Sequence, residues 1–505
     1  MVVSGSEQGS STMGVRRRFR LGCFCRKEDF FPEESFQSWK NYVKALGETR
    51  MRLKDRMLTR SKEEEEVNEM RQRSQHEMKK SLNWWDLIWF GFGAVFGAGI
   101  FVLTGLEARR DAGPAIIISF LVSGFSAMLC VFCYTEFAVD IPVAGGSFAY
   151  IRVELGDFLA FIAAGNILFE YIVGGASVAR TWTSYFATLC NHNPDDFRIY
   201  VPALPENYNH LDPLAVFIAI AIGITATIST KGSSRFNFMA TISYTVIDIS
   251  APYSMAFQAV GMNWVKYLVA IGAVVAMSTN LLASIIGQSR YFTHIGRTHM
   301  APPWLATINE KTGTPMNATI VMTSANCIVG FFTDLGVLSN LLFISTLLIF
   351  SLVAISLLVR RYYVQGETSD SDRNKFIGFL VLIIGSSVST SIYWAVGDSW
   401  IGYTITVPIW LLATLGLKVI VKEARKPKLG GVPLVPWLPS TTIAMNMFLL
   451  GSLDGASFMR FAIWSGVLLV YYLFVGLHAS FDSAKEVSRG KEESELRNVE
   501  ASRPN

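Results

Sequence analysis

Long apolar runs separated by short polar segments dominate the chain from residue 84 onward. A helix that crosses a bilayer needs about 20 apolar residues, and most of the runs approach this length. The pattern therefore predicts an all-α polytopic membrane protein with about twelve transmembrane helices. The expected spans are residues 84–104, 114–135, 158–189, 214–228, 236–248, 267–286, 318–332, 339–359, 376–395, 401–420, 441–453 and 461–477.

Polar sequence flanks this apolar region on both sides. We predict a polar N-terminal tail over residues 1–82, a membrane domain over residues 83–480 and a second polar tail over residues 481–505. The first tail contains a basic run at residues 16–18 and an acidic run at residues 63–66. Such charge runs are typical of solvated sequence.

Charged residues are distributed unequally between the two sets of loops. If the N-terminus is inside, the loops on the same side are basic and the opposite loops carry mainly aspartates. The basic set is Lys231, Arg235, Arg290, Arg297, Lys311, Arg360, Arg361, Arg373, Lys375, Lys422, Arg425, Lys426 and Lys428. The acidic set is Asp195, Asp196, Asp334, Asp398 and Asp454, with Arg109 and Arg110 as the basic exception. Lysine and arginine are enriched in cytosolic loops, so we expect both termini in the cytosol.

The first span is a poor helix at its centre. Gly91, Gly93, Gly97 and Gly99 crowd it, and each glycine costs about 1 kcal/mol relative to alanine in a helix interior. One interpretation is a helix broken at mid-membrane, whose backbone N–H groups near Gly99 bind a carboxylate. The other is close helix packing through Gly93 and Gly97. The residues alone leave both interpretations open.

Polar side chains inside the third span are the clearest candidates for chemistry. Asn166 and Glu170 are four residues apart and share one helical face. A carboxyl group in mid-membrane is costly, which favours a proton relay or an ion site. The alternative is a protonated glutamate that is hydrogen-bonded to a neighbouring helix. We expect Arg180 to lie near the outer end and to extend its charged group toward water.

The predicted span 267–286 carries Ser278 and Thr279. These hydroxyls either hydrogen-bond to carbonyls of their own helix or line a site for an ion or substrate. The segment that follows, residues 290–305, combines basic residues, histidines and two prolines, and we expect it to be an inner loop.

The remaining signals exclude several classes of protein. The chain is 51% hydrophobic and 17% charged, far from the composition of a soluble domain. It contains no phosphate-binding glycine loop, no zinc-spaced Cys/His cluster and no nucleophile elbow. We therefore predict no enzyme, no catalytic or metal site, no cofactor and no nucleic-acid partner.

Several motifs resemble the amino acid–polyamine–organocation superfamily. They are GAVFGAGIFVLTG at residues 93–105, AFIAAGNILFEY at residues 160–171 and GQSRYFTHIGRTHMAPPWLATINEKTGTP at residues 287–315. Within it, LVRRYYVQGET at residues 358–368 and GVPLVPWLPS at residues 431–440 resemble the cationic amino acid transporters. The tail sequence DFFPEESFQSWKNYVKAL, residues 29–46, is similar to plant members.

The resemblance implies an inverted repeat of five plus five helices, followed by four C-terminal spans of which the last pair covers residues 437–480. It implies transport of basic amino acids such as arginine and lysine by alternating access, with the proton as coupling ion. The expected location is the plasma membrane. By resemblance, Gly97, Ala98, Gly99 and Ile100 bind the substrate carboxylate between the unwound first and sixth helices. Asn166 and Glu170 on helix three, with Ser278 and Thr279 on helix eight, relay protons or line the site.

One departure from this family pattern lies near residues 246–250. The chain passes from YTVIDIS directly to APYSMAFQAVG, so the span 236–248 is too short and two family helices, the sixth and seventh, are absent. An alternative transcript, a gene-model error or a degenerating copy would each produce this gap. The alternative function is therefore a truncated isoform that does not transport, acting as an inert or regulatory membrane protein. Such an isoform forms homo-oligomers or pairs with full-length copies.

Overall fold

The computed structural model describes residues 30–58, 104, 113–141, 146–228, 263–309, 312–397, 400–427, 431–486 and 489. The predicted span 84–104, apart from Thr104, lies outside these residues, as do the substrate-binding candidates Gly97–Ile100. The predicted span 236–248 and the gap near residues 246–250 also lie outside them.

Helices account for nearly all regular structure in the described ranges, which confirms the all-α fold class. Seven helical stretches there are long and apolar enough to cross a membrane. They are Gly113–Asp140, Asp157–Leu189, Val269–Arg297, Leu335–Tyr362, Asp370–Val396, Ile401–Ile420 and Gly455–Glu486.

Within these stretches the regular helices are α8 (Ile116–Asp140), α10 (Asp157–Leu189), α14 (Asn263–Arg297), α16 (Leu335–Tyr362), α17 (Asp370–Val396), α18 (Ile401–Ile420) and α20 (Gly455–Tyr471). Three further predicted spans are shorter helices: α11 (Pro213–Ile228), α15 (Met316–Phe332) and α19 (Trp437–Leu450). Six shorter elements lie between or beside these helices: α9 (Ser147–Leu155), η3 (Gly113–Ala115), η4 (Pro194–Phe197), η5 (Glu206–Tyr208), η6 (Pro303–Ala306) and η7 (Tyr472–Gly476).

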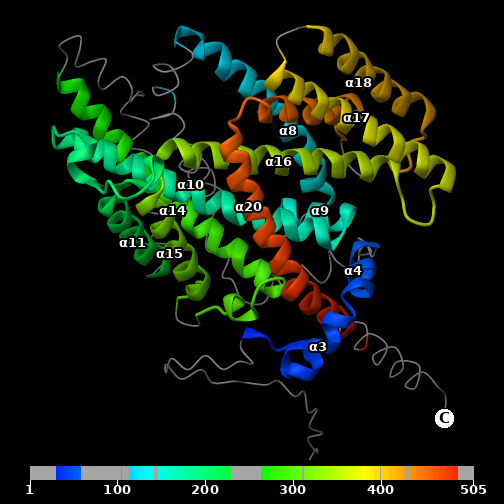
Figure 1. Cartoon of the computed structure of the whole chain (residues 1–505), viewed down its shortest axis with the longest axis horizontal. Helices are drawn as coiled ribbons and strands as arrows, with labels where there is room; N and C mark the ends of the chain where they lie inside the picture. Colours follow the sequence, from blue (N-terminus) through cyan, green and yellow to red (C-terminus); the bar gives the residue numbers. More distant parts are fainter. Residues whose placement is uncertain are drawn as a thin grey trace, which may run out of the picture.

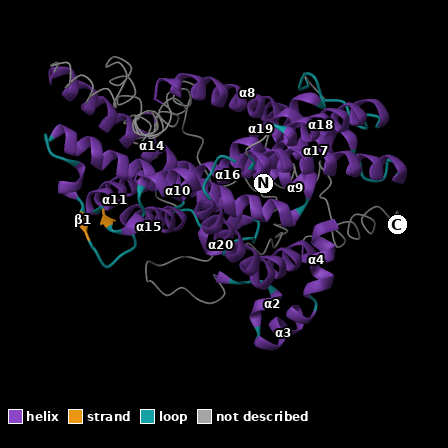
Figure 2. Cartoon of the chain, turned by 45° about the horizontal axis from the view of Figure 1, so that its top comes forward, coloured by secondary structure: helices purple, strands orange, loops and turns teal. Residues whose placement is uncertain are grey.

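Helix α10 lies at the centre of the molecule (Figure 1). It packs against α14, α15 and α11 on one side and against α16 and α9 on the other. Helices α17, α18 and α19 form a separate group around α16, on the side away from α11 and α15 (Figure 2). Helix α10 therefore reaches this group through α16, and its own side chains pack against α9, α11, α14, α15 and α16.

Helix α14 extends beyond its predicted end. The apolar run stops at residue 286, but the helix continues to Arg297, so the first part of the expected inner loop 290–305 is helical. Polar residues of this extension, Gln288 and Thr293, are fully buried. The extension is thus stabilised by packing against protein, for which hydropathy gives no signal.

A two-stranded hairpin lies in the segment between α10 and α11. Strands β1 (Ile199–Tyr200) and β2 (His210–Leu211) are antiparallel, with Ile199 opposite Leu211 and Tyr200 opposite His210. It leads the chain into α11, where Asp212 caps the helix by accepting a hydrogen bond from the Ala215 N–H at 2.9 Å.

Residues 30–58, called the N-terminal segment below, form three short helices: α2 (Glu34–Gln37), α3 (Trp39–Gly47) and α4 (Thr49–Leu58). Figure 1 shows α3 and α4 beside the C-terminal end of α20. The Asp482 carboxylate accepts a hydrogen bond from the Ser35 N–H at 2.8 Å and pairs with Arg52 at 3.2 Å. The Tyr42 hydroxyl donates to the Phe474 carbonyl at 3.2 Å.

The N-terminal segment also contacts the ends of two other long helices. Glu33 lies 2.6 Å from His299 Nδ1, just beyond α14, and Arg56 lies 3.6 Å from Asp157, the first residue of α10. These contacts bring the N-terminal segment, the start of α10, the end of α14 and the end of the last span to one face. This arrangement is consistent with the prediction that both tails are on one side of the membrane.

Candidate functional site

The carboxyl group of Glu170 is half-buried in the middle of α10. Its Oε1 lies 2.8 Å from the Thr346 hydroxyl of α16, a residue 176 positions away in the sequence. Gly174, one turn further along α10, lies against Leu342 of α16, so that an added Cβ would be 3.3 Å from a Leu342 methyl. The two helices therefore approach closely where the carboxyl group lies.

Three tyrosines lie within electrostatic range of Glu170. Tyr134 of α8, Tyr171 of α10 and Tyr291 of α14 each interact electrostatically with the carboxyl group. The rings of Tyr171 and Tyr291 have their centroids 6.0 Å apart, and the Tyr134 hydroxyl is 2.9 Å from the Ser147 hydroxyl. Side chains of four helices, including α16, thus converge on one carboxyl group.

Asn166 is fully buried one turn before Glu170. Neither its amide nitrogen nor its oxygen is hydrogen-bonded within the described part of the chain, and the same holds for Gln288 of α14. Buried amides without partners are rare because each one loses its hydrogen bonds to water. These groups form a polar interior that the described helices alone do not satisfy.

Ser278 and Thr279 of α14 lie away from Glu170, further along the length of α10. Both hydroxyls donate to carbonyls of their own helix, to Val274 at 2.8 Å and to Val275 at 3.0 Å. Ser278 also accepts a hydrogen bond from Trp182 Nε1 at 3.0 Å. Trp182 is twelve residues beyond Glu170, which corresponds to about 18 Å along a helix. The structure therefore separates the two pairs of predicted relay residues.

The structure adds two residues at Glu170 that sequence reasoning missed, Thr346 and Tyr291. Tyr291 belongs to the stretch that was expected to be a loop, and Thr346 is one hydroxyl in an apolar helix.

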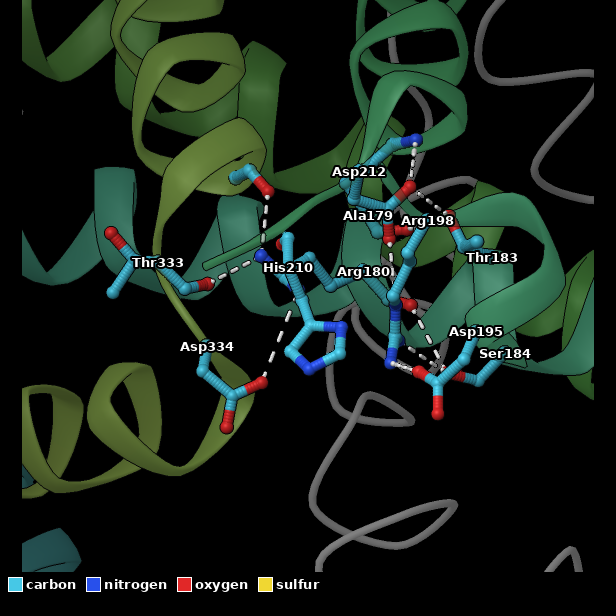
Figure 3. A network of polar contacts seen from close by, with 12 residues as sticks. Ala179, Arg180, Thr183, Ser184, Asp195, Arg198, His210, Asp212, Thr333 and Asp334 are labelled. Atoms are coloured by element: carbon cyan, nitrogen blue, oxygen red, sulfur yellow. Dashed lines mark hydrogen bonds and ion pairs between the residues drawn. The ribbon is translucent and has the colours of Figure 1, made fainter. Parts of the chain in front are cut away.

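Arg180 is buried, with an exposed fraction of 1%. Its guanidinium donates to the carbonyls of Thr333 and His210, both at 2.9 Å, and to Gly330 at 3.4 Å (Figure 3). Asp334 lies 3.9 Å away. The expectation that Arg180 extends toward water is wrong, because the end of α15 and the loop before α11 supply enough acceptors to hold the charge inside the protein.

A second buried group of charges joins α16 to α8 and α9. Arg360 is bonded to Glu154 at 2.7 Å and to Asp140 at 2.9 Å, and Arg361 is paired with Glu136 at 2.8 Å. The expectation that both arginines lie in an inner loop is wrong, because they form the last turn of α16. Their burial beside carboxylates fixes the ends of three helices relative to one another.

The sequence of the whole chain is similar to that of known transporters. It is 53% identical to "Cationic amino acid transporter 1" of Arabidopsis thaliana, covering 96% of both chains. This chain belongs to the cationic amino acid transporter family. Family members are transporters rather than enzymes. Two further relatives come from Arabidopsis thaliana. The chain is 47% identical to "Cationic amino acid transporter 5", with 91% of this chain and 97% of the relative covered. It is 44% identical to "Cationic amino acid transporter 8, vacuolar", with 91% of this chain and 93% of the relative covered.

Two family models match parts of this transporter-family chain. The model described as "Amino acid permease" matches residues 82–247, and the one described as "C-terminus of AA_permease" matches residues 431–480. The first match ends beside the predicted gap near residues 246–250.

The alignments with these family members are longer than the chain. The alignment with transporter 1 covers 575 positions, whereas 96% of 505 residues is only about 485 residues. About 90 positions of the alignment therefore have no residue from this chain. Transporter 5 gives a similar difference, with 552 positions against 91% of the chain, about 460 residues.

Proposed function

We propose that the protein is built to carry basic amino acids such as arginine and lysine across a membrane, with proton coupling through Glu170. The carboxyl group of Glu170 supports this proposal, since it lies at the meeting point of four helices and accepts a hydrogen bond from one of them. Relatives named as cationic amino acid transporters support the substrate class.

We assign the substrate carboxylate to the backbone of Gly97–Ile100, since a helix break there would supply N–H donors. Asn166 lies one turn from Glu170, and its amide has no partner in the described part of the chain, which suits a site that a substrate, water or another helix completes. Ser278 and Thr279 remain candidates for lining the path further along α14. Alternating access of an inverted repeat requires no covalent chemistry.

For location, we propose the plasma membrane, with both tails in the cytosol. The basic loops favour this orientation. The relatives carry different location names, including "vacuolar" and "chloroplastic", so the membrane itself needs a direct test. A fluorescent fusion expressed in plant cells, imaged beside plasma-membrane and vacuolar markers, provides it.

About 90 positions of the alignment with transporter 1 have no residue from this chain, and this favours a second candidate function. We infer that they correspond to family helices six and seven, beside residues 246–250, and that the chain as written is a non-transporting isoform. Such a chain would be inert, or would regulate full-length copies by pairing with them. Co-purification of tagged short and full-length chains from one membrane tests the pairing.

Glu170→Gln tests the proton coupling. The variant belongs in the chain with a relative's helices six and seven restored after Thr245, assayed in yeast that lacks its own basic amino acid permeases. An amide keeps the size of the side chain but carries no proton to the other side. Uptake should lose its dependence on external pH while exchange of labelled for unlabelled arginine persists. Unchanged pH dependence would leave Glu170 as a structural hydrogen-bond acceptor.

A further inference from the structure

The Thr346 hydroxyl has two acceptors within hydrogen-bond distance and one proton to give. Its Oγ1 lies 2.8 Å from Glu170 Oε1 and 2.9 Å from the carbonyl oxygen of Leu342, one turn earlier in α16. A hydroxyl donates one hydrogen bond and accepts up to two. The proton therefore goes to only one of these two oxygens at a time.

The protonation state of Glu170 decides whether the Thr346 hydroxyl donates to Glu170 Oε1 or to the Leu342 carbonyl oxygen. An ionised carboxylate only accepts hydrogen bonds, so Thr346 must donate to it and leaves the Leu342 carbonyl with its helical N–H bond alone. A protonated carboxyl group has its own O–H, which donates a hydrogen bond to the Thr346 oxygen. The Thr346 hydroxyl then donates its own proton to the Leu342 carbonyl instead. Both states are hydrogen-bonded, so the site accepts either form of the carboxyl group.

The other groups around Glu170 do not titrate in the same range. Among the residues that the structure describes, its titratable neighbours are the hydroxyls of Tyr134, Tyr171 and Tyr291, contributed by α8, α10 and α14. Free tyrosines ionise near pH 10. In the described part of the chain, no arginine, lysine or histidine forms an ion pair with Glu170. Thr346 is thus the group that responds directly to the charge.

We propose that Thr346 is a positioning residue that transmits the protonation state of Glu170 to helix α16. This inference rests on the proton-coupled function proposed above. A hydroxyl bonded to the carbonyl four residues earlier bends a helix slightly, and releasing that bond relaxes it. Protonation on α10 therefore changes the hydrogen bonding of one turn of α16. The same helix ends in Arg360 and Arg361, so a change in its curvature acts on the buried charges at its end.

Infrared titration of the purified 505-residue chain in lipid nanodiscs tests this inference without transport. A protonated carboxyl group has a carbonyl stretch separate from the amide bands, and Glu170→Gln identifies the part that belongs to Glu170. Thr346→Val preserves side-chain shape but removes the hydroxyl, so the ionised carboxylate loses its donor. The midpoint of the band's titration should move to higher pH by about one unit or more.

Two further variants serve as controls. Thr346→Ser keeps the hydroxyl and should keep the native midpoint. Ser345→Ala removes a neighbouring hydroxyl that donates to Leu341 at 3.1 Å and should also leave the midpoint unchanged. The inference is overturned if Thr346→Val titrates as the native chain does, if either control shifts equally, or if no titrating band depends on Glu170. If Thr346→Val shows the expected rise in the midpoint but uptake by the restored chain is independent of pH, the inference about Thr346 holds and only the proposed proton coupling is contradicted.

Discussion

At the residue scale, Arg180 shows what a buried charge requires. Arg180 and Arg360 are the largest fully buried side chains in the described ranges. The two terminal nitrogens of Arg180 donate to the carbonyls of three residues. Hydrogen bonds to a charged group contribute about 1.5–3 kcal/mol each, partly offset by the cost of removing the guanidinium from water. The end of α10 is therefore held to α15 and to the hairpin by one side chain.

Replacing this side chain should destabilise the protein. We expect Arg180→Met to lower the free energy of unfolding by about 2–4 kcal/mol, because it leaves buried carbonyls without donors. Arg373→Met is the control, since Arg373 pairs with Asp370 at an exposed site and such pairs contribute less than about 1 kcal/mol. Thermal unfolding of the two variants in detergent compares them. Equal melting temperatures for both would mean that the buried contacts contribute little.

The residues of the candidate site differ in how well sequence predicts them. Glu170 is evident, because a carboxyl group interrupts an apolar run. Thr346 is not, since hydroxyls in apolar helices usually bond to their own backbone and its partner is 176 residues away. Arg180 was noticed but misplaced, because its acceptors come from loops whose positions no local pattern specifies. The predicted role of Gly97–Ile100 stays a prediction.

At the element scale, the N-terminal segment behaves as a structural part of the protein. Arg52 and Asp482 are both buried, and losing one partner of a buried pair costs about 3–5 kcal/mol. We predict that Asp482→Asn releases the segment from the ends of α10, α14 and α20. Trypsin cleavage within residues 50–56 should then become at least tenfold faster, since about 1.4 kcal/mol corresponds to a factor of ten.

The same digestion tests the orientation. Cleavage should occur in inside-out vesicles and not in sealed right-side-out vesicles, because the segment is expected in the cytosol. Asp55→Asn is the matched control, as Asp55 is exposed and, among the described residues, pairs with the adjacent Arg56 alone, at 3.5 Å. Faster cleavage from the outside would contradict the topology, and equal cleavage in both variants would show that Asp482 does not hold the segment.

Hydropathy predicted the positions of most helices but not all of their ends. It locates α10 and α18 almost to the residue, since both runs end where polar sequence begins. It fails at the end of α14, where Gln288 and Thr293 are buried against protein. Hydropathy reports exposure to lipid, and a helix end surrounded by other helices does not need apolar residues.

At the scale of the whole molecule, the central question is whether the chain can transport without the roughly 90 residues that its relatives have in addition. In the proposed site one broken helix supplies N–H donors for the substrate carboxylate and the other supplies carbonyls for its amino group. A zwitterion held from one side keeps an unpaired charge in a low-dielectric cavity. A loss of even about 3 kcal/mol weakens binding by more than a hundredfold.

We therefore predict that the 505-residue chain inserts into the membrane but does not transport. Arginine and lysine uptake should be measured in yeast lacking its own basic permeases, for this chain and for the chain with helices six and seven restored after Thr245. Membrane fractions checked by immunoblot control for insertion. Saturable uptake by the unrestored chain at a comparable rate would show that another helix forms the second half of the site.

The contact between the N-terminal segment and the last span has a mechanical consequence. Because Ser35 and Arg52 are bonded to Asp482, near the end of the last span, a pull on the C-terminus loads these contacts before it loads the remainder of that span. In single-molecule extraction from a bilayer, the first rupture should therefore be a short event at the face that we expect in the cytosol, and it should precede the removal of helix pairs. The N-terminal segment and the last span should therefore separate before the membrane helices do.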